Sequence, residues 1–88
     1  MRRPQLVSRD EGICEEQIQM LQIGYMLQLR SQRGGFWAKI VDMYPRGYYD
    51  AMVFSRDLSG QQVEFGDMIK VHKRHIHGIG IPYDEHVN

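Results

Sequence analysis

The stretch of sequence that decides the fold runs from Phe36 to Val53 and reads FWAKIVDMYPRGYYDAMV. Apolar and aromatic residues recur at every second position on both sides of its Pro45-Arg46-Gly47 turn. A period of two places alternate side chains on opposite faces of a strand, and a tight turn brings two such strands together. We therefore expect a β-hairpin here. Its buried face would be formed by Phe36, Ala38, Ile40, Tyr49, Ala51 and Val53.

Turn residues divide the chain beyond Gly24 into short β-prone runs at intervals of about ten residues. The expected strands are residues 25–30, 36–44, 48–55, 61–65, 68–71 and 76–79. This spacing predicts a mainly β fold, in which five to six short antiparallel strands form a small barrel that leaves no open edge.

The residues before Gly24 differ from this pattern. We expect residues 1–9 to be a flexible N-terminal arm and residues 10–23 to form a short acidic helix. Ser8-Arg9-Asp10-Glu11 fits a capping box, and Cys14, Ile18 and Leu21 follow helical spacing. Alternation between Gln17 and Ile23 leaves a strand open as the other interpretation. Residues 81–88 are expected to be a surface tail.

Composition predicts a folded domain without a strong electrostatic field. Eleven basic and eleven acidic residues cancel, and apolar residues make up 42% of the 88-residue chain. A single cysteine excludes an internal disulfide. No apolar run approaches the ~20 residues that cross a bilayer, and no apolar segment of a signal peptide follows Arg2 and Arg3. We expect a cytoplasmic protein with no membrane partner.

The layout from Gly24 to Gly80 resembles that of SH3-like small barrels, including bacterial and mobile-element domains of this type. The segments that match this layout are Gly24-Tyr25-Met26-Leu27-Gln28-Leu29, the expected strands 36–41 and 48–54, a turn at Gly60, and the late strands 63–71 and 76–79. In such barrels a tight helical turn often precedes the last strand, and His72-Lys73-Arg74-His75 falls at that place. The resemblance implies the barrel for residues 24–80.

Two segments, Trp37 to Tyr48 and Gly60 to Phe65, are also similar to the plasmid-borne SH3-barrel dihydrofolate reductases. In place of that family's Val-Gln-Ile-Tyr active-site strand, this chain has Val63-Glu64-Phe65-Gly66. The glutamine and the tyrosine that the family's chemistry uses are missing, so the resemblance implies the fold and not the activity.

No catalytic motif is recognisable in the chain. The serines lack a nucleophile motif, and Gly34-Gly35 is not followed by the Gly-Lys-Ser/Thr of a phosphate-binding loop. Cys14 lies among acidic residues, which disfavour a reactive thiolate. We expect a non-enzymatic protein that needs no cofactor.

The second face of the predicted hairpin is the main candidate for function. If Phe36, Ala38 and Ile40 are buried, the other face gathers bulky aromatic and methionine side chains with Lys39 and Arg46 at the rim. Exposed patches of this composition mark protein interfaces. We expect this face to bind a protein partner or a second copy, unless the N-terminal helix covers it or the alternation is reversed. Its residues are Trp37, Met43, Tyr48, Met52 and Phe54.

The segment from Lys70 to His77 provides two weaker alternatives. Lys70, Lys73 and Arg74 are three cations without an intervening acid, which suggests weak nucleic-acid binding through phosphate contacts. Zero net charge argues against it. His75 and His77 would share a face of a continued strand and could hold a metal ion, with His72, His86 or Asp84 as a third ligand. Histidine spacing alone is a weak indication of a metal site.

Overall fold

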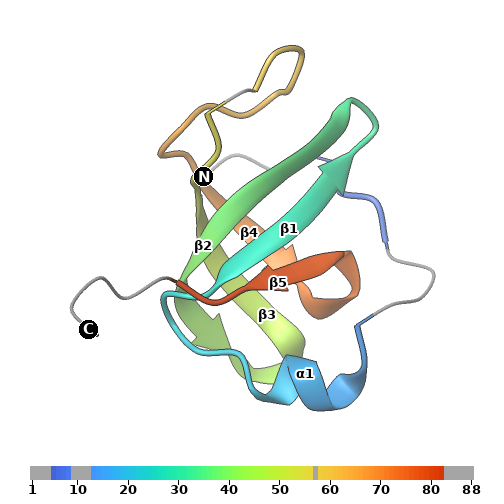
Figure 1. Cartoon of the computed structure of the whole chain (residues 1–88), viewed down its shortest axis with the longest axis vertical. Helices are drawn as coiled ribbons and strands as arrows, with labels where there is room; N and C mark the ends of the chain where they lie inside the picture. Colours follow the sequence, from blue (N-terminus) through green and yellow to red (C-terminus); the bar gives the residue numbers. More distant parts are fainter. Residues whose placement is uncertain (1–4, 9–12, 57, 83–88) are drawn as a thin grey trace.

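In the computed structural model, five antiparallel strands form one sheet in the order β4-β3-β2-β1-β5, with a short helix near the N-terminus (Figure 1). The structure describes residues 5–8, 13–56 and 58–82. Its elements are α1 (Glu15–Gln19), β1 (Met26–Ser31), β2 (Gly34–Tyr44), the 3-10 turn η1 (Pro45–Gly47), β3 (Tyr48–Val53), β4 (Met68–His72), the 3-10 turn η2 (Lys73–His75) and β5 (Gly78–Gly80). The expected mainly β class with antiparallel strands and a short helix is confirmed.

Strand β2 is the longest strand and joins the two parts of the sheet. Its first half pairs with β1, from Ser31 opposite Gly34 to Met26 opposite Lys39. Its second half pairs with β3 around the Pro45 turn, ending with Tyr44 opposite Tyr48. The predicted hairpin is therefore present. Figure 1 shows β2 extending from the tip of the β1–β2 hairpin to the turn that leads into β3.

One face of the sheet, which we call the inner face, carries the core. Phe36, Ala38 and Ile40 of β2 are buried, as are Tyr49, Ala51 and Val53 of β3. Neighbouring strands contribute Leu27, Leu29, Ile69 and Val71 to the same cluster. The alternation expected from the sequence is confirmed for these six hairpin residues, and the reversed alternation is excluded.

A β-bulge in β2 changes which residues share a face. Ile40 pairs with Ala51, but Asp42 pairs with Asp50, so Val41 is an extra residue in the strand. One extra residue moves every following side chain to the opposite face. Met43 consequently pairs with the buried Tyr49 and lies on the inner face, where it is 38% exposed at the end of the core. The expectation that Met43 shares a face with Trp37 and Tyr48 is wrong.

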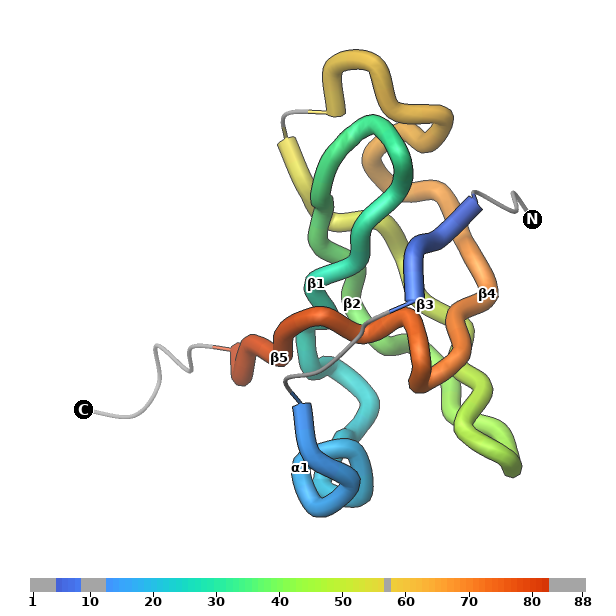
Figure 2. The backbone as a smooth tube through the Cα atoms, turned by 90° about the vertical axis from the view of Figure 1, so that its right-hand side faces the viewer, coloured from blue at the N-terminus to red at the C-terminus, as the bar shows by residue number. Residues whose placement is uncertain are grey.

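The helix is shorter than the expected span of residues 10–23. It begins after Cys14, whose backbone N–H donates to Gln17 Oε1 at 3.2 Å. Residues 9–12, which include most of the predicted capping box, lie outside the described residues. Ile18 and Leu21 join the core cluster, whereas Cys14 is exposed. Figures 1 and 2 place α1 at the end of the molecule opposite the tip of the β1–β2 hairpin.

No strand forms over residues 61–65, so the expected sixth strand is wrong. Local hydrogen bonds replace a ladder there: the backbone N–H of Glu64 donates to Asp67 Oδ2 at 2.8 Å, and the N–H of Asp67 donates to the carbonyl of Glu64. Short polar side chains compete with strand pairing in this way. Val63 alone is buried in this segment.

Residues 5–8, which we expected within a flexible arm, are held beside β1. Leu6 forms an isolated antiparallel bridge with Ser31, and the N–H of Val7 donates to the carbonyl of Arg30 at 2.8 Å. Leu6 also packs against the core. At the other end of the chain, Ile81 and Pro82 are exposed, and residues 83–88 lie outside the described residues.

Candidate functional site

The face of the sheet opposite the core, which we call the outer face, is built from cross-strand rows of side chains. Residues that pair across antiparallel strands point to the same side, so the register defines each row. Along β2 from the Pro45 turn, the first row is Tyr44, Tyr48 and His72, and the second row is Asp42, Asp50 and Lys70. The third row is Lys39, Met52, Met68 and Met26, and the fourth row is Trp37 and Gln28. Phe54 follows beside Trp37, because its N–H donates to the Trp37 carbonyl.

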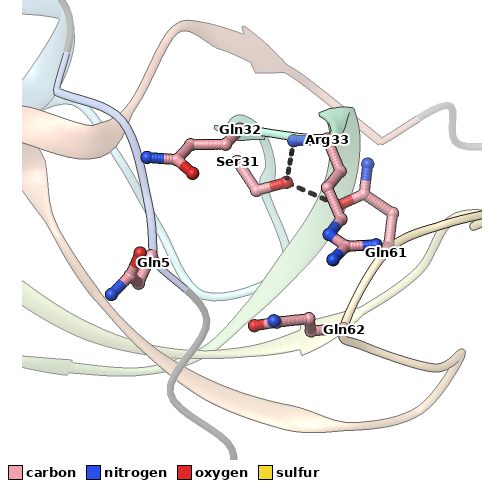
Figure 3. A pocket seen from close by; sticks show the side chains of 6 residues that line it. All are labelled: Gln5, Ser31, Gln32, Arg33, Gln61 and Gln62. Atoms are coloured by element: carbon pink, nitrogen blue, oxygen red, sulfur yellow. Dashed lines mark hydrogen bonds between the residues drawn. The ribbon is translucent and has the colours of Figure 1, made fainter.

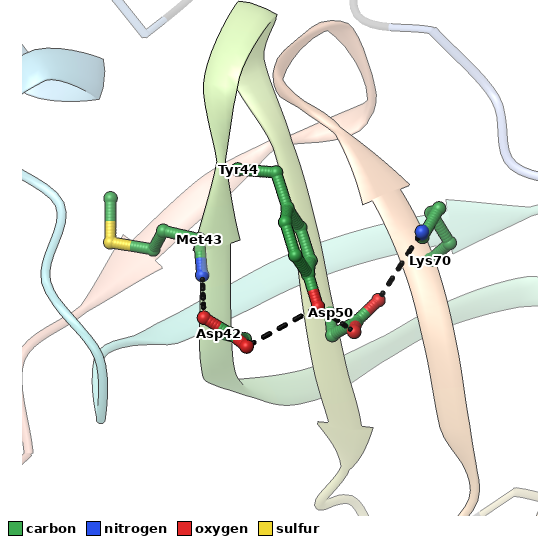
Figure 4. Close-up of polar contacts among 5 residues, drawn as sticks. All are labelled: Asp42, Met43, Tyr44, Asp50 and Lys70. Carbon is green, nitrogen blue, oxygen red and sulfur yellow. Dashed lines mark hydrogen bonds and ion pairs between the residues drawn. The ribbon is translucent and has the colours of Figure 1, made fainter.

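Two of these rows form a hydrogen-bonded polar end. The Tyr44 hydroxyl donates to Asp50 Oδ2 at 2.7 Å and lies 3.2 Å from Asp42 Oδ2. Lys70 Nζ lies 3.8 Å from Asp50 Oδ1, which is too long for a hydrogen bond, and 5.0 Å from the centre of the Tyr44 ring. Figure 4 shows these four side chains together, with Met43 pointing away from them.

The polar end changes the ionisation of Tyr44. Its hydrogen bond to Asp50, followed by burial and the charges of the two aspartates, raises the pKa of Tyr44 to about 12. The hydroxyl therefore keeps its proton and serves as a donor between the two carboxylates over the whole neutral range. This arrangement stabilises two acidic residues that face each other across β2 and β3.

The other end of the outer face is apolar, and we define the apolar end as Trp37, Met52, Phe54 and Phe65. Trp37 and Met52 are half-buried, while Phe54 is 46% and Phe65 57% exposed. Trp37 packs on β5 where Gly80 lacks a side chain: a Cβ at Gly80 would lie 3.3 Å from Trp37 Cζ3. The indole is thus held by the fold, whereas the two phenylalanine rings present apolar surface to the solvent.

Phe54, Arg56 and Phe65 line an open pocket at the apolar end. The centres of the two rings are 5.2 Å apart and their planes are inclined by 41°. Lys39 Nζ lies 6.0 Å from the centre of the Phe54 ring. Sequence reasoning missed Phe65 and Arg56, because the first was placed in a strand that does not form and the second lies beyond the end of β3.

The structure brings together four of the five residues predicted to bind a partner. Trp37, Tyr48, Met52 and Phe54 share the outer face, although Tyr48 belongs to the polar end, where its ring contacts His72 at 4.6 Å between centres. Met43 does not share this face. The N-terminal helix does not cover this face either, because Ile18, the buried residue of α1, packs with the inner-face core.

The cations of the basic segment point to different places. Lys70 lies on the outer face beside Asp50. Lys73 Nζ bonds to Glu15 Oε1 of α1 at 3.0 Å. Arg74 is exposed in η2. Two of the three cations thus lie against carboxylates of this chain, which leaves less positive charge for phosphate contacts than the sequence alone indicates.

His72, His75 and His77 each take part in a hydrogen bond within the chain. The N–H of His72 donates to His75 Nδ1 at 3.3 Å, and the N–H of Arg74 donates to His72 Nδ1 at 3.2 Å. His77 Nε2 lies 2.8 Å from the carbonyl of Val7. Burial, with the positive charge of Arg74, lowers the pKa of His75. Because His75 belongs to η2 and His77 precedes β5, the expected shared strand face is wrong.

No group of three or more metal-ligating side chains occurs within residues 5–8, 13–56 and 58–82. The predicted third ligands Asp84 and His86 lie outside these ranges. The pair His75 and His77 is therefore not supplemented by a further ligand in the part of the chain that the structure describes.

A second, polar pocket lies at the tip of the β1–β2 hairpin (Figure 3) and is lined by Gln5, Ser31, Gln32, Arg33, Gln61 and Gln62. The Ser31 hydroxyl donates to Gln61 Oε1 at 2.7 Å and accepts from the N–H of Arg33 at 3.1 Å. Arg33 in turn donates to the carbonyl of Gly60 at 3.1 Å. These bonds tie the hairpin to the loop before β4, which is a structural role.

Comparison of the chain with protein-family models, with curated proteins and with solved structures finds no match. Among the described residues, no helix is both long and apolar enough to pass through a lipid bilayer.

Proposed function

We propose that the chain is an SH3-like small barrel that works as a non-enzymatic interaction module, binding a protein partner or a second copy through its outer face. The strand order β4-β3-β2-β1-β5, the long β2 that pairs in both parts of the sheet, and the η2 turn before β5 support the barrel. The same order of elements carries the resemblance in the sequence.

One observation carries the proposed function: two phenylalanine rings at the apolar end lie against each other and both remain about half exposed. Phe54 lies beside the half-buried Trp37 and two residues after the half-buried Met52, and Phe65 lies against Phe54, so apolar side chains follow one another from β2 over the end of β3 to the loop before β4. Contiguous apolar surface rich in aromatic residues and methionine is typical of the centre of protein interfaces.

Site-specific photo-crosslinking tests this proposal. A photoreactive phenylalanine analogue is introduced at Phe54 or Phe65, and in control variants at Met20, which is 70% exposed at the C-terminal end of α1. Cross-linked adducts at positions 54 and 65, and not at position 20, are expected in cells that express the protein. Adducts at all three positions, or at none, would contradict the proposal.

Light scattering separates the two kinds of partner. A mass that rises from the 10.4 kDa of one chain to twice that value with increasing concentration indicates a second copy. Phe54→Ser and Phe65→Ser should then restore the monomer mass, and Met20→Ser should not. A constant monomer mass together with adducts at position 54 indicates a different protein.

Nucleic-acid binding through Lys70, Lys73 and Arg74 remains the alternative. It is less supported, because Asp50 and Glu15 lie against two of these cations. Salt-sensitive binding of an oligonucleotide that is lost in Arg74→Glu would favour it over the proposed function.

A further inference from the structure

The pocket formed by Phe54, Arg56 and Phe65 has a specific chemistry. We infer that it binds an apolar side chain of a peptide segment that carries a carboxylate beside that side chain. This inference rests on the proposed function and adds the class of partner that the outer face recognises.

The backbone that carries the two phenylalanine walls of the pocket is held by hydrogen bonds. The N–H of Phe54 donates to the Trp37 carbonyl at 2.9 Å, and the N–H of Val53 donates to the Asp67 carbonyl at 2.8 Å. The N–H of Gly66, next to Phe65, donates to the Val53 carbonyl at 2.8 Å. The end of β3 and the loop that carries Phe65 are thus joined by hydrogen bonds. A pocket whose walls are fixed before binding loses less conformational entropy when a ligand enters.

The pocket also has a definite shape. With centres 5.2 Å apart and planes inclined by 41°, the two rings touch and form an open, angled apolar surface. An aliphatic or aromatic side chain that lies over this surface contacts both rings and removes apolar surface from water. Two exposed rings that line one pocket provide the kind of anchor site that carries much of the affinity in protein interfaces.

Two cationic side chains lie at the pocket. The Arg56 side chain forms one wall, and Lys39 Nζ lies 6.0 Å from the centre of the Phe54 ring. Glu64 is the exposed neighbour of Phe65 but does not line the pocket. The aspartates of the outer face lie two rows away and bond to Tyr44. A guanidinium group matches the geometry of a carboxylate, so an acidic residue next to the apolar anchor complements this site.

Two acetylated, amidated and fluorescently labelled peptides provide the test. One has the sequence Glu-Asp-Leu-Phe-Asp, and the other has the sequence Lys-Lys-Leu-Phe-Lys, which keeps the apolar pair and reverses the charge. Fluorescence anisotropy measures binding, and amide chemical shifts around Phe54 and Phe65 locate it. We expect the acidic peptide to bind at this pocket and the basic peptide not to bind.

Two variants test whether Arg56 and Phe65 contribute to peptide binding, and a third variant is a charge-matched control. Arg56→Glu and Phe65→Ser should each weaken binding of the acidic peptide at least about tenfold, the scale of a charged hydrogen bond or a buried aromatic anchor. Arg74→Glu introduces the same charge change in η2, on a side chain that is exposed as well, and should leave the affinity unchanged. Amide spectra of all three variants establish that they are folded.

Several results would overturn the inference. These are equal binding of both peptides, no effect of Arg56→Glu in a folded variant, chemical shift changes elsewhere, or an oligothymidine probe that binds this pocket more tightly than the acidic peptide. If neither peptide binds but photo-crosslinking at position 54 still captures a partner, the proposed function stands and this inference fails. If crosslinking fails as well, both fail.

Discussion

Replacing Gly47 by alanine tests the contact that joins the hairpin turn, η2 and α1. Gly47 has a φ of +79°, and a Cβ added there would lie 2.7 Å from Lys73 Cδ and 2.8 Å from Lys73 Cγ. The same lysine bonds to Glu15 of α1 at 3.0 Å. Gly60 is a matched control, since its φ is +78° but an added Cβ meets no atom within 4 Å. Both substitutions place an alanine in a left-handed backbone conformation, but only Gly47→Ala brings the new Cβ against the Lys73 side chain.

The expected magnitudes follow from these two sites. A left-handed conformation costs an alanine about 1–2 kcal/mol, and the stiffer unfolded chain offsets about 0.4–1 kcal/mol of this. Gly60→Ala should therefore lower the free energy of unfolding by about 1 kcal/mol. Gly47→Ala should cost about 1–2 kcal/mol more. The Lys73 side chain must leave its rotamer, at roughly 0.5–1.5 kcal/mol, and lose an exposed ion pair worth roughly 0.2–1 kcal/mol.

Urea unfolding followed by the fluorescence of Trp37, the single tryptophan, provides the measurement. In a Lys73→Ala background only the Cβ of residue 73 remains, 3.3 Å from the added atom, so the cost of Gly47→Ala should fall towards that of Gly60→Ala. Equal costs for the two glycine substitutions in the wild-type background would refute the contact between Gly47 and Lys73. So would an unchanged cost of Gly47→Ala after truncation of the lysine.

Three further outcomes are expected. Phe36→Ala should lower the free energy of unfolding by about 3–5 kcal/mol because it leaves a cavity in the core. Phe54→Ala should lower it by less than about 1 kcal/mol. Similar urea midpoints of the two variants would contradict the assignment of Phe36 to the inner face and Phe54 to the outer face. The free energy of unfolding should fall as the pH drops below about 6.5, because the lowered pKa of His75 lets the unfolded chain take up the proton first, and His75→Gln should reduce this dependence. An ultraviolet titration should include a tyrosine step at about pH 12 that Tyr44→Phe removes, while burial raises the pKa of Tyr49 independently of this substitution. Since the folded pKa is the raised one, the stabilisation from the Tyr44 hydroxyl is complete below about pH 10 and is lost as the pH rises towards 12; a uniform titration near 10 would contradict the hydrogen bond.

The sequence predicted most of the sheet because alternation is a direct consequence of strand geometry. Phe36, Ala38 and Ile40 are apolar at a period of two, and they are buried together with their partners on β3. The Pro45-Arg46-Gly47 turn fixed the register of this hairpin. Local composition was sufficient here, because each residue's face depends only on its neighbours within one strand.

The position of Met43 could not be predicted from the same pattern. The bulge at Val41 adds one residue to β2, and nothing in the alternation of apolar residues distinguishes a continuous strand from one with this insertion. Beyond the bulge Tyr44 takes the place on the outer face that the pattern assigns to Met43. The outer face therefore has a polar end built around a tyrosine, where the sequence predicted a continuous apolar surface.

The pocket residues Phe65 and Arg56 could not be predicted for a different reason. The apolar pattern of residues 61–65 favours a strand, but Asp67 bonds to the N–H of Glu64 and turns the chain. Val63 then points into the core, and Phe65 becomes exposed near the end of β3. A side-chain hydrogen bond of one aspartate thus decides where an aromatic residue lies. Apolar periodicity takes no account of such local bonds between a side chain and the backbone.

The two ends of the outer face differ in what a partner must displace. At the polar end Asp50 Oδ2 accepts from the Tyr44 hydroxyl and Asp42 Oδ1 accepts from the N–H of Met43, so a partner that bonds to these oxygens would exchange existing bonds for new ones at little net gain. At the apolar end Phe54 and Phe65 expose ring surface whose burial is favourable without any exchange. For the proposed partner, binding free energy should therefore concentrate at the pocket, and the polar end should act mainly on the orientation of the bound segment through charge.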